Sequence, residues 1–177
     1  MIKYGKILKM HEKDNPSPFC RASYLISNVG DMIKCYGRML RFPDDAHIYQ
    51  KEMELAMGDV IMQCRLIQVE NDIKETDITS TILDGKIGLM VRSMYYATYI
   101  EDILYRKEWN NHKYIHNVQE TIKTETGVFN IKTAIEHMLI ALNTQCYNFD
   151  LNFEEIQHLG FIHTIERFEE FERRGWK

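Results

Sequence analysis

Apolar side chains recur three and four residues apart along most of this chain, the spacing of one face of an α-helix. The first such stripe follows Ser17-Pro18, a serine cap with proline in the first helical position. Pro43 ends the helix near Arg41 because the residue before a proline disfavours helical geometry. The inward positions are Leu25, Val29, Met32, Ile33, Tyr36 and Leu40.

A second helix follows after a short connection. Asp44 or Asp45 caps it, and its stripe continues to about Glu70. The inward positions are Met53, Met57, Val60, Ile61, Cys64 and Ile67. Because only a few residues join the two helices, we expect them to pack antiparallel. Residues 71–83 are polar and β-branched and are interpreted as a linker.

A third helix is predicted from Asp84-Gly85 to Lys107, with its apolar stripe directed inward. Those inward positions are Ile87, Met90, Val91, Met94, Tyr95, Thr98 and Ile103. The tyrosine-rich run 94–99 could stack a nucleobase, but aromatic residues at helical spacing more often belong to a core. The stretch 108–128 is the least regular, and a short helix is predicted at 116–123.

Two asparagines begin the last two predicted helices. Asn130 caps a helix whose inward positions are Ile131, Ala134, Ile135, Met138, Leu139 and Leu142. Asn152, with a glutamate three residues later, forms a capping box before a tail helix at 153–173. Gly160 is expected to interrupt that tail helix. His158 and His163 also lie on it, and we expect both at the surface.

No segment shows sustained alternation of period two, so no sheet is predicted. The chain is interpreted as one all-α domain over residues 1–177, a bundle of five or six helices. Its parts are an N-terminal arm (1–16), a first helix pair (17–70), the linker (71–83) and a second half with the tail helix (84–177). The second half could be a diverged copy of the first.

Composition narrows the class of protein. A net charge of -4 and a pI near 6.0 argue against a general nucleic-acid-binding surface. The four cysteines form no CxxC pair and are expected to be free thiols, at positions Cys20, Cys35, Cys64 and Cys146. No apolar run is long enough for a secretory signal or a membrane span, so we expect a cytoplasmic protein without a membrane partner.

Helical-wheel geometry places polar residues on matching flanks of the first two helices. On the first they are Asn28, Asp31, Cys35 and Arg38, and on the second Glu52, Ala56, Asp59 and Gln63. Clustered carboxylates repel one another, and Mg²⁺ relieves that repulsion while binding substrate phosphates. Such a site can activate water for hydrolysis of a phosphoanhydride. The alternative is that these are ordinary solvated residues at the bundle edge.

Three segments carry a family resemblance. Asn28-Val29-Gly30-Asp31, the run 52–64 and the tail 149–176 resemble the MazG-like nucleotide pyrophosphohydrolases. That family is all-α and carries an E-x-x-E motif on one helix and an E-x-x-D motif on a later one. The resemblance implies Mg²⁺-dependent cleavage of nucleoside triphosphates to monophosphate and pyrophosphate. It also implies pairing into a homodimer or a higher homo-oligomer.

The family motifs are only partly present here. E-x-x-E falls on Asn28 and Asp31, and E-x-x-D falls on Ala56 and Asp59. Glu52 lies one turn before Ala56 and is the proposed substitute. The resemblance thus implies that Asp31, Glu52 and Asp59 hold the metal and serve catalysis. Residues expected to contact the nucleotide are Asn28, Arg38 and Gln63. The alternative is a catalytically inactive MazG-like protein that binds a nucleotide or a protein partner.

Overall fold

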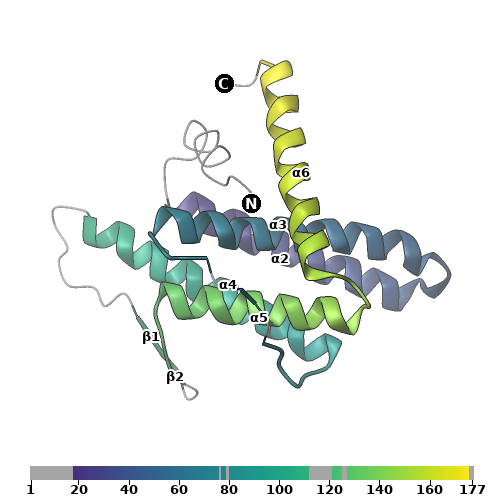
Figure 1. Cartoon of the computed structure of the whole chain (residues 1–177), viewed down its shortest axis with the longest axis horizontal. Coiled ribbons are helices and arrows are strands. Elements are labelled where there is room, and N and C mark those ends of the chain that lie inside the picture. The colour runs from purple at the N-terminus through teal and green to yellow at the C-terminus, as the bar shows by residue number, and fades with distance from the viewer. Residues whose placement is uncertain (1–17, 76, 79, 112–120, 125–126, 176–177) are drawn as a thin grey trace.

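The computed structural model of the chain describes residues 18–75, 77–78, 80–111, 121–124 and 127–175. These residues form five α-helices, a short 3-10 turn and one two-stranded hairpin (Figure 1). In chain order they are α2 (Pro18–Arg41), η1 (Pro43–Asp45), α3 (Ala46–Glu70), α4 (Lys86–Asn111), β1 (Ile122–Thr124), β2 (Gly127–Phe129), α5 (Ile131–Asn148) and α6 (Phe153–Arg173). The predicted all-α helical bundle is confirmed.

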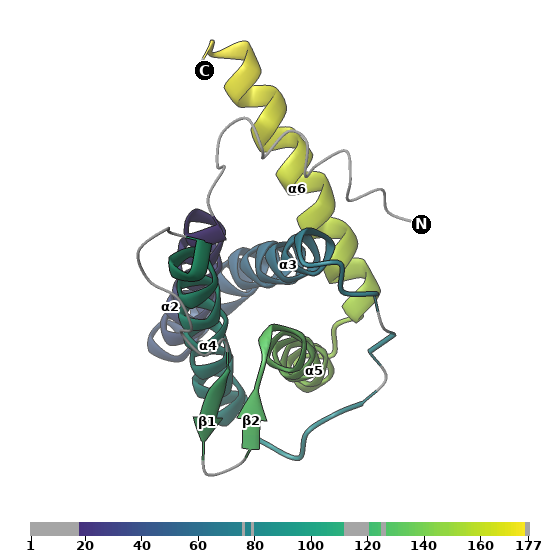
Figure 2. The same ribbon diagram turned by 90° about the vertical axis from the view of Figure 1, so that its left-hand side faces the viewer.

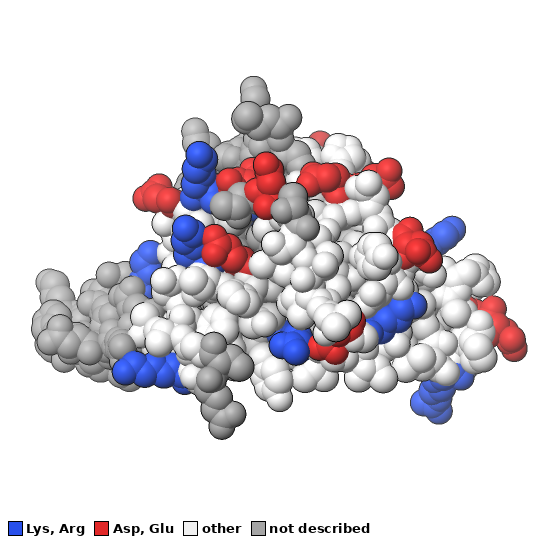
Figure 3. Space-filling model, turned by 60° about the horizontal axis from the view of Figure 1, so that its bottom comes forward, with Lys and Arg blue, Asp and Glu red and all other residues white. Residues whose placement is uncertain are grey.

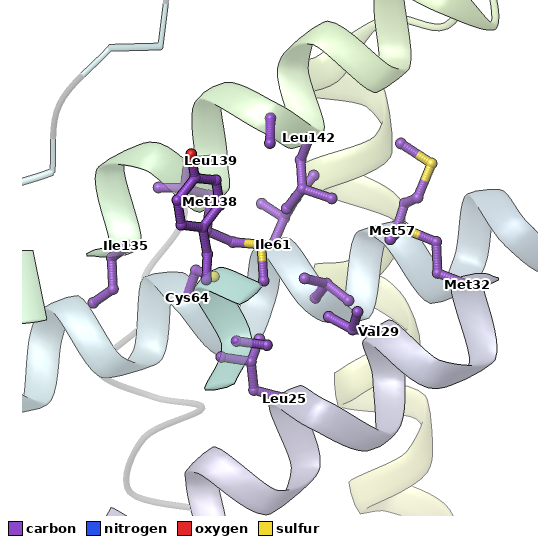
Figure 4. Close-up of a cluster of buried hydrophobic side chains, with 14 of the residues drawn as sticks. Leu25, Val29, Met32, Met57, Ile61, Cys64, Ile135, Met138, Leu139 and Leu142 are labelled. Carbon is purple, nitrogen blue, oxygen red and sulfur yellow. The ribbon is translucent and has the colours of Figure 1, made fainter. Parts of the chain in front are cut away.

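Helices α2, α3, α4 and α5 form the body of the bundle, and α6 crosses α3 and extends away from it (Figures 1 and 2). Helix α2 packs against both α3 and α4, while α4 packs against α5. The core between α2, α3 and α5 is filled by aliphatic and methionine side chains (Figure 4). Among them, Leu25, Val29, Ile61, Met138 and Leu142 are fully buried.

Polar caps fix the starts of the last two helices. The side-chain oxygen of Asn130 accepts from the Thr133 backbone N–H at 2.9 Å, and the Thr133 hydroxyl accepts from the Asn130 N–H at 2.9 Å. The Asn152 side chain accepts from the backbone of Glu154 and Glu155. Both asparagines are therefore confirmed as caps; the reciprocal capping box forms at Asn130, and the half of the box assigned to the Glu155 side chain stays a prediction. Asp45 precedes α3, but its side chain makes no capping hydrogen bond.

A short antiparallel hairpin corrects two expectations for the second half. Residue Ile122 of β1 pairs with Phe129 of β2, and Thr124 pairs with Gly127. The predictions of a helix reaching residue 123 and of no sheet were therefore wrong at these positions, and 116–120 lie outside the described residues. Strands of three residues are too short to show a period-two pattern, although their residues suit a pleated surface.

Helix α4 buries a different face from the predicted one. Met90 and Ile103 are buried as expected, but Ile87, Val91 and Tyr95 are 65%, 46% and 58% exposed. The positions that pack inward instead are Leu89, Ser93, Tyr96, Ala97, Ile100 and Leu104. Apolar residues occur on two sides of this helix, so their spacing alone did not identify the buried side. On α2, Leu40 is 61% exposed and was likewise wrongly expected inside.

All four cysteines are free thiols, as the sequence predicted. Burial raises the pKa of Cys64 and of Cys146 to about 12, which keeps both protonated at neutral pH. Within the described residues, no helix combines the length and apolar character needed to cross a bilayer.

Candidate functional site at the crossing of α3 and α6

The backbones of α3 and α6 touch where two glycines face each other. A Cβ atom added to Gly58 would lie 2.7 Å from the backbone nitrogen of Gly160. One added to Gly160 would lie 2.1 Å from the carbonyl oxygen of Gly58. Only a hydrogen fits in that space. The sequence prediction that Gly160 interrupts the tail helix was wrong, because α6 is continuous and the glycine serves the crossing.

Asp59 follows Gly58 and is held by two basic residues of α6. Its Oδ1 lies 2.9 Å from His163 Nδ1, and its Oδ2 lies 3.7 Å from a guanidinium nitrogen of Arg167. Burial raises the pKa of Asp59, while the hydrogen bond to His163 and the charges of His163 and Arg167 lower it. The expectation of a surface position for His163 was wrong: its side chain is 26% exposed and turned toward α3.

Asp31 of α2 belongs to the same electrostatic neighbourhood. Its negative charge contributes to the raised pKa of Asp59. Asp31 itself is exposed, and its Oδ1 lies 3.4 Å from Lys34 Nζ. Asp31 is thus an exposed carboxylate whose charge acts on the buried carboxylate of Asp59, while His163 and Arg167 of α6 contact Asp59 directly.

Glu52 makes a separate set of contacts. Its Oε2 lies 3.5 Å from a guanidinium nitrogen of Arg38 and 3.8 Å from the Sγ of Cys35. Burial, followed by the charge of Glu52, raises the pKa of the Cys35 thiol. Among the described residues, no three His, Cys, Asp or Glu side chains gather closely enough to hold a metal ion. The contacts of Glu52 therefore do not join those of Asp59 and Asp31.

Gln63 carries one of the buried polar atoms that lack a hydrogen-bond partner among the described residues. It lies one turn after Asp59 on α3 and is buried. The atom without a partner is its side-chain oxygen. A buried acceptor without a partner costs about 1–3 kcal/mol, so a hydrogen-bond donor placed beside this oxygen would be stabilising. Asn28 lies half-buried on α2, three residues before Asp31.

Further along α3, a buried arginine ties the same two helices together. Arg65 Nε donates to Gln157 Oε1 at 2.9 Å, and another guanidinium nitrogen donates to Gln68 Oε1 at 3.0 Å. Arg65 Nε also lies 3.4 Å from a carboxylate oxygen of Glu75. Sequence reasoning missed this network. The available signal was the set of polar residues within the apolar stretch 53–68 of α3.

The residues around Asp59 allow two kinds of contact. Asp31, Asp59 and Gln63 offer oxygen atoms of the kind that divalent cations prefer, and His163 and Arg167 offer positive charge to phosphate oxygens. Comparison of the chain with protein-family models, curated proteins and solved structures finds no match.

Proposed function

We propose that this chain is a MazG-like, Mg²⁺-dependent nucleotide pyrophosphohydrolase that acts where α6 crosses α3, beside Asp31 of α2. The observation that carries the proposal is the environment of Asp59. This buried carboxylate contacts His163 and Arg167 directly, and the negative charge of Asp31 acts on it from α2. A nucleotide hydrolase of this kind needs carboxylates that hold a metal ion and positively charged side chains that bind phosphate oxygens.

The donor set fits Mg²⁺ in part. Asp31 and Asp59 would hold the ion directly, and the unpartnered oxygen of Gln63 would complete an oxygen-rich set. When bound, Mg²⁺ would neutralise phosphate charge and orient a water molecule. Glu52, which the sequence assigned to the metal, is bonded to Arg38 instead. In this proposal it positions Arg38 toward the nucleotide, beside Asn28 on the same flank of α2.

The two basic residues of α6 have a separate role. The Arg167 side chain is 47% exposed, so its guanidinium can exchange Asp59 for a phosphate without crossing the core. Arginine binds phosphate through parallel hydrogen bonds, which makes that exchange favourable. His163 would then keep its hydrogen bond to Asp59 and fix the orientation of the carboxylate. We propose the cytoplasm, which supplies nucleotides and Mg²⁺, as the compartment, and a homodimer as the working form.

Pyrophosphate release from a panel of nucleoside triphosphates, with and without Mg²⁺, tests this function. We expect Mg²⁺-dependent release by the wild type and its loss in Asp59→Ala. Asp102→Ala is the matched control, because Asp102 pairs with Arg106 on α4, outside the proposed site, and should leave the rate unchanged. Release that persists in Asp59→Ala would remove the site assignment.

A second candidate is a MazG-like protein that binds a nucleotide without hydrolysing it. Asn28 and Ala56 lack the carboxylates of the family motifs, and Asp59 is already paired with His163 and Arg167. Calorimetry separates the two candidates. Binding that needs no Mg²⁺, weakens at least about tenfold in Arg167→Ala (about 1.4 kcal/mol) and leads to no turnover would support the non-catalytic protein.

A further inference from the structure

Two pairs of charged groups cross from α2 to α3 along one edge of the bundle. A guanidinium nitrogen of Arg38 lies 3.5 Å from Glu52 Oε2, and the negative charge of Asp31 acts on Asp59. Arg38 follows Asp31 by seven residues on α2. Glu52 precedes Asp59 by seven residues on α3. Seven residues are close to two helical turns, so the two pairs share one face of each helix and lie about 10 Å apart along it.

The Arg38–Glu52 pair is accessible to a ligand. The two side chains are 43% and 49% exposed. Both contacts of the Glu52 carboxylate use Oε2, and the second one reaches Cys35 Sγ at 3.8 Å. Neither contact is as short as an ordinary charge-assisted hydrogen bond, so the carboxylate retains capacity to accept from a ligand. On the side of the bundle where α4 and α5 lie, by contrast, uncharged residues fill the middle of the face (Figure 3).

Short side chains lie between the two pairs of charged groups. Cys35 follows Asp31 by one turn of α2, and it is buried. Ala56 precedes Asp59 by about one turn of α3, and it is also buried. Neither side chain stands in the way of a ligand that runs along the helices from one pair to the other. A nucleoside triphosphate is such a ligand, because its sugar separates the charged phosphates from the base.

We propose that the Arg38–Glu52 pair binds the base of the nucleotide and selects guanine. This inference rests on the proposed function, which places the phosphates beside Asp59 and Arg167. With the phosphates there, the base extends to the second pair of charged groups, about two turns away along α2 and α3.

The chemistry of the pair matches one edge of guanine. A carboxylate accepts two hydrogen bonds side by side, and the neighbouring guanidinium group donates. Guanine presents the complement of this arrangement on its Watson–Crick edge, with N–H donors at N1 and N2 next to the O6 acceptor. The base therefore bonds both Glu52 and Arg38, and their ion pair stays closed.

The other common bases fit this pair less well. Adenine places its N1 acceptor where the carboxylate needs a donor, and cytosine does the same with N3. Uracil has one N–H donor between two acceptors, so one carboxylate oxygen would meet an acceptor. Two acceptors that face each other repel, and selectivity arises from such mismatches as well as from the correct contacts.

Aromatic rings beside the pair offer a stacking surface for the base. The guanidinium carbon of Arg38 lies 5.6 Å from the centre of the Tyr49 ring. The Phe42 ring, which is 43% exposed, lies 6.1 Å from the Tyr49 ring between centroids. Aromatic rings stack on every base with little preference. In this arrangement the rings add affinity, whereas the Arg38–Glu52 pair supplies the selectivity.

Calorimetry with α,β-methylene analogues of guanosine, adenosine and inosine triphosphates tests the selection, because these analogues resist cleavage between the α- and β-phosphates. With Mg²⁺ present, we expect the wild type to bind the guanosine analogue at least about tenfold more tightly than the other two. Inosine lacks only the 2-amino group of guanosine. That comparison therefore tests one hydrogen bond to Glu52 without changing the protein.

Glu52→Gln tests the same hydrogen bond from the side of the protein. We expect this variant to bind the guanosine analogue no more tightly than the inosine analogue, because the amide nitrogen cannot accept the second N–H group. Glu54→Gln is the matched control, since Glu54 lies on the same helix and accepts from Gln50 Nε2 at 3.2 Å. The control should keep the preference for guanosine.

The outcomes separate this inference from the proposed function. Equal binding of the three analogues by the wild type, or a guanosine preference that survives in Glu52→Gln, would overturn the selection of guanine and leave the proposed function standing. If none of the analogues binds to the wild type, the proposed function and the inference both fail.

Discussion

The contact between α3 and α6 and the contact between α4 and α5 hold helices together by different means. Where α3 meets α6, Gly58 and Gly160 bring two backbones into contact, polar pairs lie beside them, and a small apolar cluster of Met62, Leu66 and Phe168 lies further along. Asp59 bonds His163 across this contact, and Arg65 bonds Gln157. Each of these interactions needs one relative placement of the two helices, because hydrogen bonds are directional.

The α4–α5 contact is apolar and aromatic instead. Phe129, at the end of the hairpin, lies 6.1 Å from the Tyr96 ring and 5.2 Å from the His137 ring, between centroids. Tyr99 lies 5.3 Å from the same phenylalanine. Apolar burial stabilises without demanding one geometry. The body of the bundle is therefore held by apolar area, whereas α6 adds directional polar contacts to a smaller apolar cluster, and those polar contacts also form the candidate site.

The largest expected effect comes from filling the glycine contact. In Gly160→Ala the new Cβ would lie 2.1 Å from the Gly58 carbonyl oxygen, so the helices must separate and the polar contacts beside them must lengthen. We expect a loss of about 3 kcal/mol in the free energy of unfolding, at the upper end for overpacking, measured by urea denaturation. Gly37→Ala on α2 meets open space and should stabilise the chain by up to about 1 kcal/mol. Equal stability of Gly160→Ala and the wild type would contradict the close crossing.

A smaller effect is expected at the aromatic contact. Phe129→Leu keeps an apolar side chain but removes the ring that meets Tyr96, Tyr99 and His137. We expect a loss of about 1 kcal/mol, because apolar replacements of similar size are tolerated. Val128→Ala, at the neighbouring exposed position, should change stability by less than about 0.5 kcal/mol. If Phe129→Leu lost more free energy of unfolding than Gly160→Ala, the aromatic contact would be the more demanding of the two, contrary to the comparison.

Helix ends could be predicted from the sequence because local chemistry sets them. Pro43 stops α2 at Arg41, and the side chains of Asn130 and Asn152 satisfy backbone N–H groups at the starts of α5 and α6. These signals act within four residues. Because these local signals end α2 at Arg41 and allow α3 to begin at Ala46, the connection is short, and the pairing of the two helices could be predicted from its length.

The parts that sequence reasoning missed depend on distant segments. Asp59 and His163 are 104 residues apart, and nothing in the local sequence of α6 distinguishes His163 from a surface histidine. Apolar residues occur on two sides of α4, and the side that is buried is the one that packs against α2 and α5. The sequence pattern predicted Ile87 and Val91 inside, but both are exposed in the structure.

The smallest expected effect is on the pH dependence of the free energy of unfolding, and it comes from the charge of Asp59. The prediction is the direction of that dependence. Burial is the main cause that raises the pKa of Asp59 above its ordinary value of 3.8. Between that value and the raised pKa, the folded state binds more protons than the unfolded state, so stability rises as pH falls. The free energy of unfolding of the wild type should therefore increase relative to Asp59→Asn as pH is lowered from 7 toward 4. In His163→Gln the same gain should begin at a higher pH, because the hydrogen bond to His163 lowers the pKa of Asp59. Urea denaturation over that pH range measures both effects, and a wild type that loses stability relative to Asp59→Asn on acidification would show that the pairs with His163 and Arg167 outweigh the desolvation of the carboxylate.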